Sequence, residues 1–447
     1  MDNKQFYKRM FALAFPIAMQ NLLSSCGYLI DTAMVVGLGN VATSAIGIAT
    51  RWSFIMNVLI FGVCSGSAAL IAQYWGAGDE RNIRRSVGIA LVVGTGISII
   101  YVLAAAFFPM QMMMIFTDEA AVMKAGAGYI RTVCLAMLFN SATFVVSTAV
   151  RSTEDVKTPF IASACGVVVN IVLNYTFIYG HFGMPKMGLN GAALGTVIAM
   201  AAQAVVIIVI AYKKKSVFLR SIRQLFEWDK AFVKKYFAVS TPVLFNEIFW
   251  SVGTSIYSVI LARQGSENYS AYTIFNSVHE VFFVFFVGLC NACAIMVGKT
   301  IGEDRLDEAY HMAKKYLIAF PLVSVVLGGL QILLRNPVLS IMSIETEGAR
   351  LTASHLLVLH GLLMPFINIP YVAVVGIFRA GGDTRFGFFV DAGSVYLIGI
   401  PVLWYLAYMT EVSFVALVAG MYIGEYALKT FLCIWRFKSG KWIRRLT

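Results

Sequence analysis

Five carboxylates lie inside long apolar segments of this sequence, where an ionised side chain is costly. A charged residue at the centre of a membrane-spanning helix costs about 2.5–3.5 kcal/mol on insertion scales. Such residues therefore need a partner or a function, and the usual functions are ion binding and proton transfer. The five are Asp31, Glu247, Glu280, Asp391 and Glu425.

Asp31 has the surroundings best suited to binding a monovalent cation. It lies about 30 Å along the first apolar segment from Arg9, as helical rise predicts. Asn170 and Asn174 are spaced i,i+4 in the fifth segment and share one helix face, and Thr196 reaches an overlapping depth in the sixth. These four oxygen-bearing side chains could hold Na⁺, or a proton tuned by hydrogen bonding. The alternative is a polar patch that only closes helix contacts.

Glu247 and Glu280 are candidates for a substrate site or a second proton site. Glu247 follows Pro242 by five residues, and a proline in a spanning helix often borders a cavity. We expect Glu247 to bind a proton or to act as counter-charge for a cationic substrate. Glu280 adjoins His279 as a possible proton-relay pair, although adjacent residues do not share a helix face.

Glu425 and Asp391 have simpler explanations. Glu425 and Lys429 are spaced i,i+4 in the last apolar segment, so the two charges can neutralise each other without any function. Asp391 lies about one turn inside its segment, where it could reach the interface or cap the helix.

The elements that carry these residues are predicted to be membrane-spanning helices. Of the 447 residues, 59% are hydrophobic and only 13% are charged, whereas soluble domains are about 25% charged. Most segments exceed the roughly 20 residues that cross a bilayer, and the alternation expected of barrel strands is missing. The segments are 10–37, 49–75, 85–108, 125–150, 158–180, 188–212, 233–262, 268–298, 312–334, 352–378, 386–409 and 412–435.

The basic residues predict the orientation. With the N-terminus in the cytoplasm, 27 of the 35 Lys and Arg residues fall on the cytoplasmic side, 7 on the other side and 1 within a span. Positively charged loops are retained inside, so we expect both termini in the cytoplasm of a multi-pass protein of the cytoplasmic (inner) membrane. The net charge of +12 then reflects these loops, and no nucleic-acid partner is expected.

The sequence repeats itself at offsets of 224 to 228 residues. With six spans in each half, the repeats share an orientation and relate by an axis along the membrane normal, an architecture that suits alternating access. We predict an N-terminal six-helix lobe (1–212), a cytoplasmic linker (213–232), a C-terminal six-helix lobe (233–435) and a basic cytoplasmic tail (436–447). The matching pairs are GAGDER at 76–81 with TIGEDR at 300–305, RSTEDVK at 151–157 with RAGGDTR at 379–385, Asn140 with Asn368, and Pro16 with Pro242.

Several of these motifs together resemble the multidrug and toxic compound extrusion (MATE) family over essentially the whole chain, in its bacterial NorM-like and DinF-like forms. The resemblance implies an antiporter, not an enzyme, that exports small organic cationic or aromatic substrates in exchange for Na⁺ or H⁺. It implies no cofactor, contact with membrane lipids, and a monomer. The motifs are Pro16, Asp31-Thr-Ala-Met, Gln73 with the GAGD turn, RSTEDVKTP, Asn170-x-x-x-Asn174-Tyr, Gly188-Leu-x-Gly191-Ala and RAGGDTR.

The same resemblance assigns expected roles to individual residues. Family members keep an acid in span one near polar groups of spans five and six, which carries over onto the predicted Asp31 site. NorM-like members also use acids in spans seven and ten. Glu247 matches the first, but the second falls on Asn368, which cannot titrate. DinF-like members often carry a second acid in span five, where this chain has Asn174. The coupling ion therefore stays open between Na⁺ and H⁺.

Two other functions compete with the antiporter. A flippase for lipids or lipid-linked oligosaccharides shares the layout of two six-span halves, but anionic headgroups call for basic residues within the spans, and here the charges are mostly acidic. An intramembrane enzyme needs paired aspartates, a Ser/His dyad or H-E-x-x-H. His355 and His360 have no glutamate at the required spacing.

Overall fold

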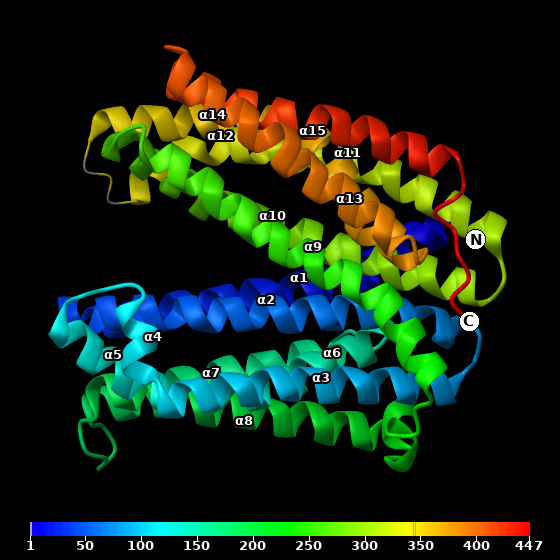
Figure 1. Ribbon diagram of the computed structural model, residues 1–447, viewed down its shortest axis with the longest axis horizontal. Coiled ribbons are helices and arrows are strands. Elements are labelled where there is room, and N and C mark those ends of the chain that lie inside the picture. Colours follow the sequence, from blue (N-terminus) through cyan, green and yellow to red (C-terminus); the bar gives the residue numbers. More distant parts are fainter. Residues whose placement is uncertain (1, 343, 345) are drawn as a thin grey trace. The chain divides into compact units, whose positions relative to one another are not determined.

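The computed structural model describes residues 2–342, 344 and 346–447, which contain helices and no strand (Figure 1). Within these described residues, eleven helices are long and apolar enough to span a membrane, and a bent pair counted as one span brings the number to twelve. The predicted all-α membrane architecture is confirmed. The spans are α1 (Asn3–Val36), α2 (Asn40–Gly76), α3 (Glu80–Phe107), α7 (Lys157–Tyr179), α8 (Gly188–Lys213), α9 (Lys230–Ala262), α10 (Ser266–Gly302), α11 (Leu306–Ile341), α12 with η3 (Glu347–Phe378), α13 with η4 and α14 (Thr384–Met409), and α15 (Phe414–Lys438).

The fourth predicted span, 125–150, is the bent pair. After the short α4 (Pro109–Met114), α5 (Ala120–Val133) and α6 (Ala136–Ser152) meet at an angle of 46°. At the break, the amides of Leu135 and Met137 bond to carbonyls three residues back instead of four. These bonds tighten the turn and bend the helix without a proline or glycine, so composition does not reveal the break.

The chain divides into two compact units, and each is considered by itself. The C-terminal unit consists of Met1–Ala18, Ala72–Ala77 and Thr241–Thr447, and the N-terminal unit of Met19–Ile71 and Gly78–Ser240. Helices α1, α2 and α9 therefore contribute residues to both units.

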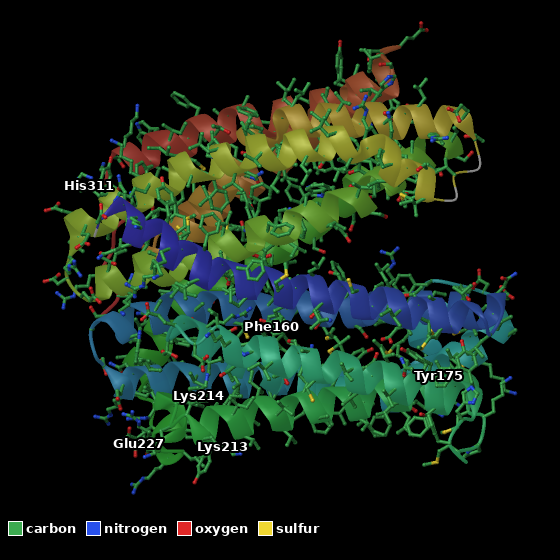
Figure 2. All side chains as sticks on the ribbon, turned by 180° about the vertical axis from the view of Figure 1, so that it is seen from behind. Phe160, Tyr175, Lys213, Lys214, Glu227 and His311 are labelled. Carbon is green, nitrogen blue, oxygen red and sulfur yellow. The ribbon has the colours of Figure 1, made fainter. Side chains whose placement is uncertain are left out.

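In the N-terminal unit, the segment that links α8 to α9 folds against α3. Its two short turns are η1 (Val217–Leu219) and η2 (Arg223–Leu225). Arg84 of α3 donates from Nε to the carbonyl of Val217 (2.9 Å) and from Nη1 to Gln224 (2.7 Å). In Figure 2, Lys213, Lys214 and Glu227 gather at the end of this unit opposite Tyr175. The predicted linker is thus an ordered segment, and its last residues already belong to α9.

The loop after α6 is closed by Asp155, which lies outside the spans. Its carboxylate accepts hydrogen bonds from the backbone and hydroxyl of Thr158, and it pairs with Lys214 Nζ at 2.9 Å. Partial burial acts to raise the pKa of Asp155, but the bonds from Thr158 and Lys214 outweigh it and hold the pKa below its ordinary value. This aspartate of the RSTEDVK motif therefore ties α7 to the end of α8.

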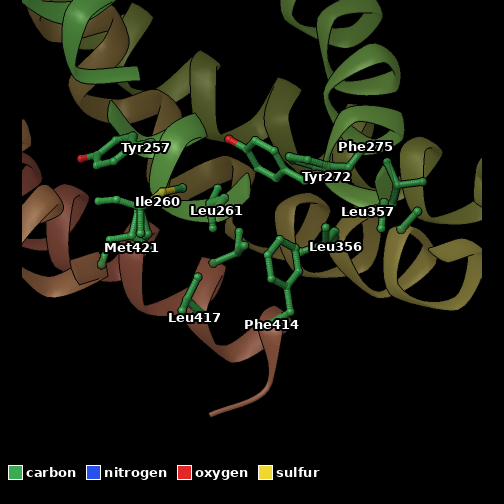
Figure 3. Close-up of a cluster of buried hydrophobic side chains, with 14 of the residues drawn as sticks. Tyr257, Ile260, Leu261, Tyr272, Phe275, Leu356, Leu357, Phe414, Leu417 and Met421 are labelled. Carbon is green, nitrogen blue, oxygen red and sulfur yellow. The ribbon is translucent and has the colours of Figure 1, made fainter. Parts of the chain in front are cut away.

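A large apolar cluster forms the core of the C-terminal unit (Figure 3). Two spans of this unit contain π-helical turns, η3 (Val372–Phe378) and η4 (Val395–Gly399). Such turns are rare and recur at functional sites. The labelled core side chains come from α9 (Tyr257, Ile260, Leu261), α10 (Tyr272, Phe275), α12 (Leu356, Leu357) and α15 (Phe414, Leu417, Met421).

The residues after α15 fold back onto the same unit. Trp442 is fully buried, and the amide of Arg444 donates to Gly381 (2.8 Å). The buried Asp383 of the RAGGDTR motif pairs with Arg436 at 2.7 Å and with Arg444 at 2.8 Å. The predicted basic tail is therefore a packed element that begins as the last turn of α15.

Candidate functional site

Asp31 and the two predicted asparagines lie together in the N-terminal unit. Asn174 Nδ2 donates to Asp31 Oδ1 at 2.8 Å. With the nitrogen of its amide facing the carboxylate, Asn170 lies 3.0 Å from Oδ2 and 2.5 Å from Oδ1. Both asparagines are buried, and their i,i+4 spacing places them on successive turns of α7 that face α1.

Asn174 also carries an oxygen that stays unsatisfied. Among the described residues, no hydrogen bond reaches the buried Asn174 Oδ1. This oxygen lies close to α8, where a Cβ on Gly195 would come within 2.3 Å of it. The asparagine can occupy this position because residue 195 has no side chain. Gly195 was not predicted from the sequence, although the run of small residues in α8 signals close helix packing.

Thr196 bonds within its own helix, while an aromatic residue joins the site. The Thr196 hydroxyl donates to the carbonyl of Ala192 at 2.9 Å, one turn earlier in α8. Tyr179 of α7 donates to the carbonyl of Met34 at 2.9 Å and fixes the end of α1 beside this cluster.

The hydrogen-bond partners of the half-buried Asp31 are neutral amides, not cationic side chains. Its charge is therefore available for an exchangeable cation or proton. Carboxylate and amide oxygens are ligands that a hard cation accepts, and a terminal amide presents either its nitrogen or its oxygen on rotating by half a turn. The residues present thus fit a site in which amide N–H groups donate to the carboxylate when no ion is bound, and oxygen atoms bind Na⁺ when it is. They also fit a site at which the carboxylate binds H⁺ directly.

Glu247 and Glu280 lie in different surroundings within the C-terminal unit. Glu247 of α9 accepts a hydrogen bond from Arg379 Nη2 at 2.5 Å, and both side chains are largely buried. Glu280 is exposed on α10. Its neighbour His279 packs against His360, with ring centroids 4.5 Å apart. A role of either glutamate in substrate or proton binding stays a prediction.

Asn368 connects two helices. Its amide donates to Ser324 Oγ of α11 at 3.1 Å and to the carbonyl of Met364 at 3.0 Å, and the side chain is buried. Its counterpart in the other half, Asn140, donates to Asn57 at 2.7 Å. The repeated asparagine thus makes an interhelical hydrogen bond in each unit.

Glu425 and Lys429 are paired as the i,i+4 spacing predicts, but they have a third partner. Lys429 Nζ lies 3.4 Å from Glu425 Oε1 and also pairs with Asp391 Oδ1, and all three side chains are largely buried. The expectation that Asp391 caps its helix or reaches the interface is wrong, because Asp391 and Lys429 meet across two helices. Spacing along one helix cannot reveal such a contact.

Comparisons with known proteins agree over most of the chain. A family model described as MatE matches residues 16–176 and 242–405. The "Probable multidrug resistance protein YoeA" of Bacillus subtilis is 25% identical over 426 residues, which are 94% of this chain and 90% of that protein. The "Probable multidrug resistance protein NorM" of Thermotoga maritima is 24% identical over 445 residues, 98% of this chain and 93% of that protein.

Solved structures share the fold. The Vibrio cholerae MATE transporter VcmN in the bent form matches with a TM-score of 0.88 and 15% identity, over 98% of this chain and 97% of that chain. An outward-facing multidrug resistance MATE family transporter of the MOP superfamily matches with a TM-score of 0.84 and 15% identity, over 97% of this chain and 96% of that chain. At these identities the likeness establishes the two-lobe helical fold and nothing finer.

Proposed function

Because the chain belongs to the MATE family of membrane transporters, we propose that it exports small organic cations and aromatic drugs in exchange for Na⁺ or H⁺. The family consists of transporters, so this chain is a transporter and not an enzyme. The two relatives named above carry multidrug resistance in their names, which supports drug export here.

The contact of Asp31 with Asn170 and Asn174 carries the proposal. A carboxylate in a spanning helix is costly unless it has a role, and the partners of this one leave its charge uncompensated. In the proposed cycle, Asp31 binds the coupling ion while the site is open to one side and releases it when the site is open to the other. If the ion is Na⁺, Asp31, Asn170 and Asn174 would hold it, and its charge would neutralise the carboxylate.

The charges of the C-terminal unit favour cationic cargo over the anionic headgroups of a flippase substrate. The basic residues buried among its helices are engaged by acids, Arg379 by Glu247 and Lys429 by Asp391 and Glu425. Anionic cargo would need such cations to be available. A cation or a flat aromatic molecule needs a carboxylate and aromatic faces, and the exposed Glu280 of α10 is a carboxylate outside these pairs.

The proposed setting is the cytoplasmic membrane, with both termini in the cytoplasm. Twelve spans return the chain to the side where it starts, and 27 of its 35 Lys and Arg residues then lie inside. Two related six-helix halves are the architecture in which alternating access operates without a partner, and we propose a monomer.

Dye transport in proteoliposomes tests this function. Efflux of ethidium is measured under a Na⁺ gradient alone and under a pH gradient alone, for wild type, Asp31→Asn and Asp118→Asn. Asp118 is exposed in the loop before α5, so its variant makes the same chemical change outside the site. We expect one gradient to drive efflux and only Asp31→Asn to abolish that dependence. Normal gradient-driven efflux by Asp31→Asn would refute the mechanism.

A further inference from the structure

We propose that Glu425 of the C-terminal unit is a second proton-binding site, which exchanges its proton beside a permanent Asp391–Lys429 ion pair. The inference deepens the proposed function by adding a site for H⁺ far along the chain from Asp31. Its test is a titration that needs no transport, so it can fail or hold independently of that function.

Three helices and a π-helical turn build the site. Tyr257 of α9 donates from its hydroxyl to Glu425 Oε2 at 2.9 Å, and Lys429 Nζ lies 3.4 Å from Glu425 Oε1. Asp391 of α13 takes the closer position against Lys429. The side chains of Glu425 and Lys429 are each 6% exposed and that of Asp391 is 11% exposed. The cluster is therefore largely shielded from bulk water.

The cluster holds one carboxylate more than it has cations. Asp391 and Lys429 neutralise each other, so an ionised Glu425 would leave a full negative charge among apolar and aromatic side chains. Such a buried charge costs several kcal/mol, and the usual escape is to take up a proton. The Tyr257 hydroxyl suits both states, because it can donate to a carboxylate or accept from a carboxyl group.

The other groups that face Glu425 do not change the excess of one carboxylate over the cations in the cluster. The neighbours other than Asp391 and Lys429 are tyrosines, and one histidine packs against them, so they supply dipoles and no second permanent cation. The ring of Tyr426 lies under the Lys429 ammonium, 4.8 Å from the centroid, and stabilises that cation further. The set is Tyr257 of α9, Tyr272 of α10, His360 of α12, Asp391 of α13, and Tyr422, Tyr426 and Lys429 of α15.

The backbone makes room for the contact. A Cβ on Gly399, the last residue of η4, would collide with the Tyr257 hydroxyl and lie 3.4 Å from Glu425 Cβ. The π-helical turn thus ends at a glycine that lets Tyr257 reach Glu425. Interrupted helices of this kind recur at functional sites.

The repeat shows that the fold does not require these charges. The offsets of 228 and 226 residues between the halves relate Asp391 to Ser163 and Lys429 to Gln203. In the N-terminal unit, Gln203 Nε2 donates to Ser163 Oγ at 3.1 Å, so a neutral pair connects the same two helices. The offset between Pro16 and Pro242 relates Tyr257 to Asp31. Glu425 therefore contacts Tyr257, the residue that occupies the position of Asp31 in the C-terminal half.

Infrared spectroscopy of the protein in lipid nanodiscs tests the proposal. The carbonyl stretch of protonated carboxyl groups is followed across a pH series from about pH 5 to about pH 9. We expect a band that disappears with rising pH, is missing in Glu425→Gln and is unchanged in Glu411→Gln, whose glutamate is exposed between α14 and α15. A wild-type spectrum identical to that of Glu425→Gln at every pH overturns the proposal.

A second variant gives an independent reading. In Asp391→Asn, Glu425 becomes the only acid beside Lys429 among the residues that the structure describes. We therefore expect Glu425 to stay ionised and its protonated band to vanish, although the carboxyl group is still present. Persistence of the band in this variant contradicts the charge argument. Asp31→Asn should leave the Glu425 band in place, because the two sites belong to different units of the fold. Loss of efflux in Asp31→Asn would then concern only the proposed drug export and not the proton site at Glu425.

Discussion

Gly195→Ala should disable the Asp31 site without unfolding the protein. The new Cβ would lie 2.3 Å from Asn174 Oδ1, whereas ordinary van der Waals contact begins at 3.4 Å. The Asn174 amide must therefore retreat by about 1 Å, which stretches its 2.8 Å bond to Asp31 beyond the length at which a hydrogen bond persists.

The size of the effect follows from that lost bond. A hydrogen bond to a charged group contributes about 1.5–3 kcal/mol, which corresponds to roughly ten- to hundredfold in an equilibrium constant. We expect gradient-driven dye efflux in proteoliposomes to fall by about that factor. Alanine is a better helix former than glycine by about 1 kcal/mol, which offsets part of the lost bond, so the thermal unfolding temperature should drop only slightly while the protein still folds.

Two controls separate the clash from a general effect of alanine. Gly96→Ala in α3 has open space around its Cβ and should transport normally. Adding Gly195→Ala to Asn174→Ala should cost little further activity, because the side chain that clashes is gone. Wild-type efflux by Gly195→Ala, or losses that simply add in the double variant, would refute the reasoning.

Three further outcomes concern stability in detergent, measured by thermal unfolding. The pKa of Asp155 lies below its ordinary value of 3.8, so the pairing of Asp155 with Lys214 stabilises the protein above that pH. This stabilisation is lost as the pH falls through the lowered pKa. Asp155→Asn should therefore weaken the dependence of the unfolding temperature on acid pH, and an unchanged dependence would contradict the prediction. Gly66→Ala would place a Cβ about 2.4 Å from the Cα of Ser240 and should cost about 1–3 kcal/mol, and equal stability with wild type is the opposing result. Asp383→Asn removes the buried acid that pairs with Arg436 and Arg444, and it should lower the free energy of unfolding by about 3 kcal/mol. An unaltered unfolding temperature would contradict this prediction.

The sequence predicted the helices well because their signal is local. Long apolar stretches, the basic loops and the repeated motifs identify the spans directly. The bend between α5 and α6 and the turns η3 and η4 were not predicted, because they depend on how backbone hydrogen bonds shift within a helix whose composition stays apolar. The packed tail around Trp442 was also missed, since only tertiary contacts bury it.

The candidate site was predictable only where spacing along one helix was informative. The i,i+4 pair in α7 indicated that Asn170 and Asn174 act together, and depth indicated Asp31 as their partner. Three other contacts between helices were not predicted. Gly195 beside Asn174, Arg379 beside Glu247 and Asp391 beside Lys429 become visible only when the helices are packed.

Reverse coupling tests the central claim that Asp31 links the ion to the drug. Proteoliposomes are loaded with a fluorescent indicator for Na⁺ or for H⁺, and an outward drug gradient is imposed with no ion gradient present. We expect uphill movement of one of these ions into the liposomes by wild type and by Asp118→Asn, and none by Asp31→Asn. Equal ion movement by Asp31→Asn, or drug efflux by wild type that moves neither ion, would contradict it.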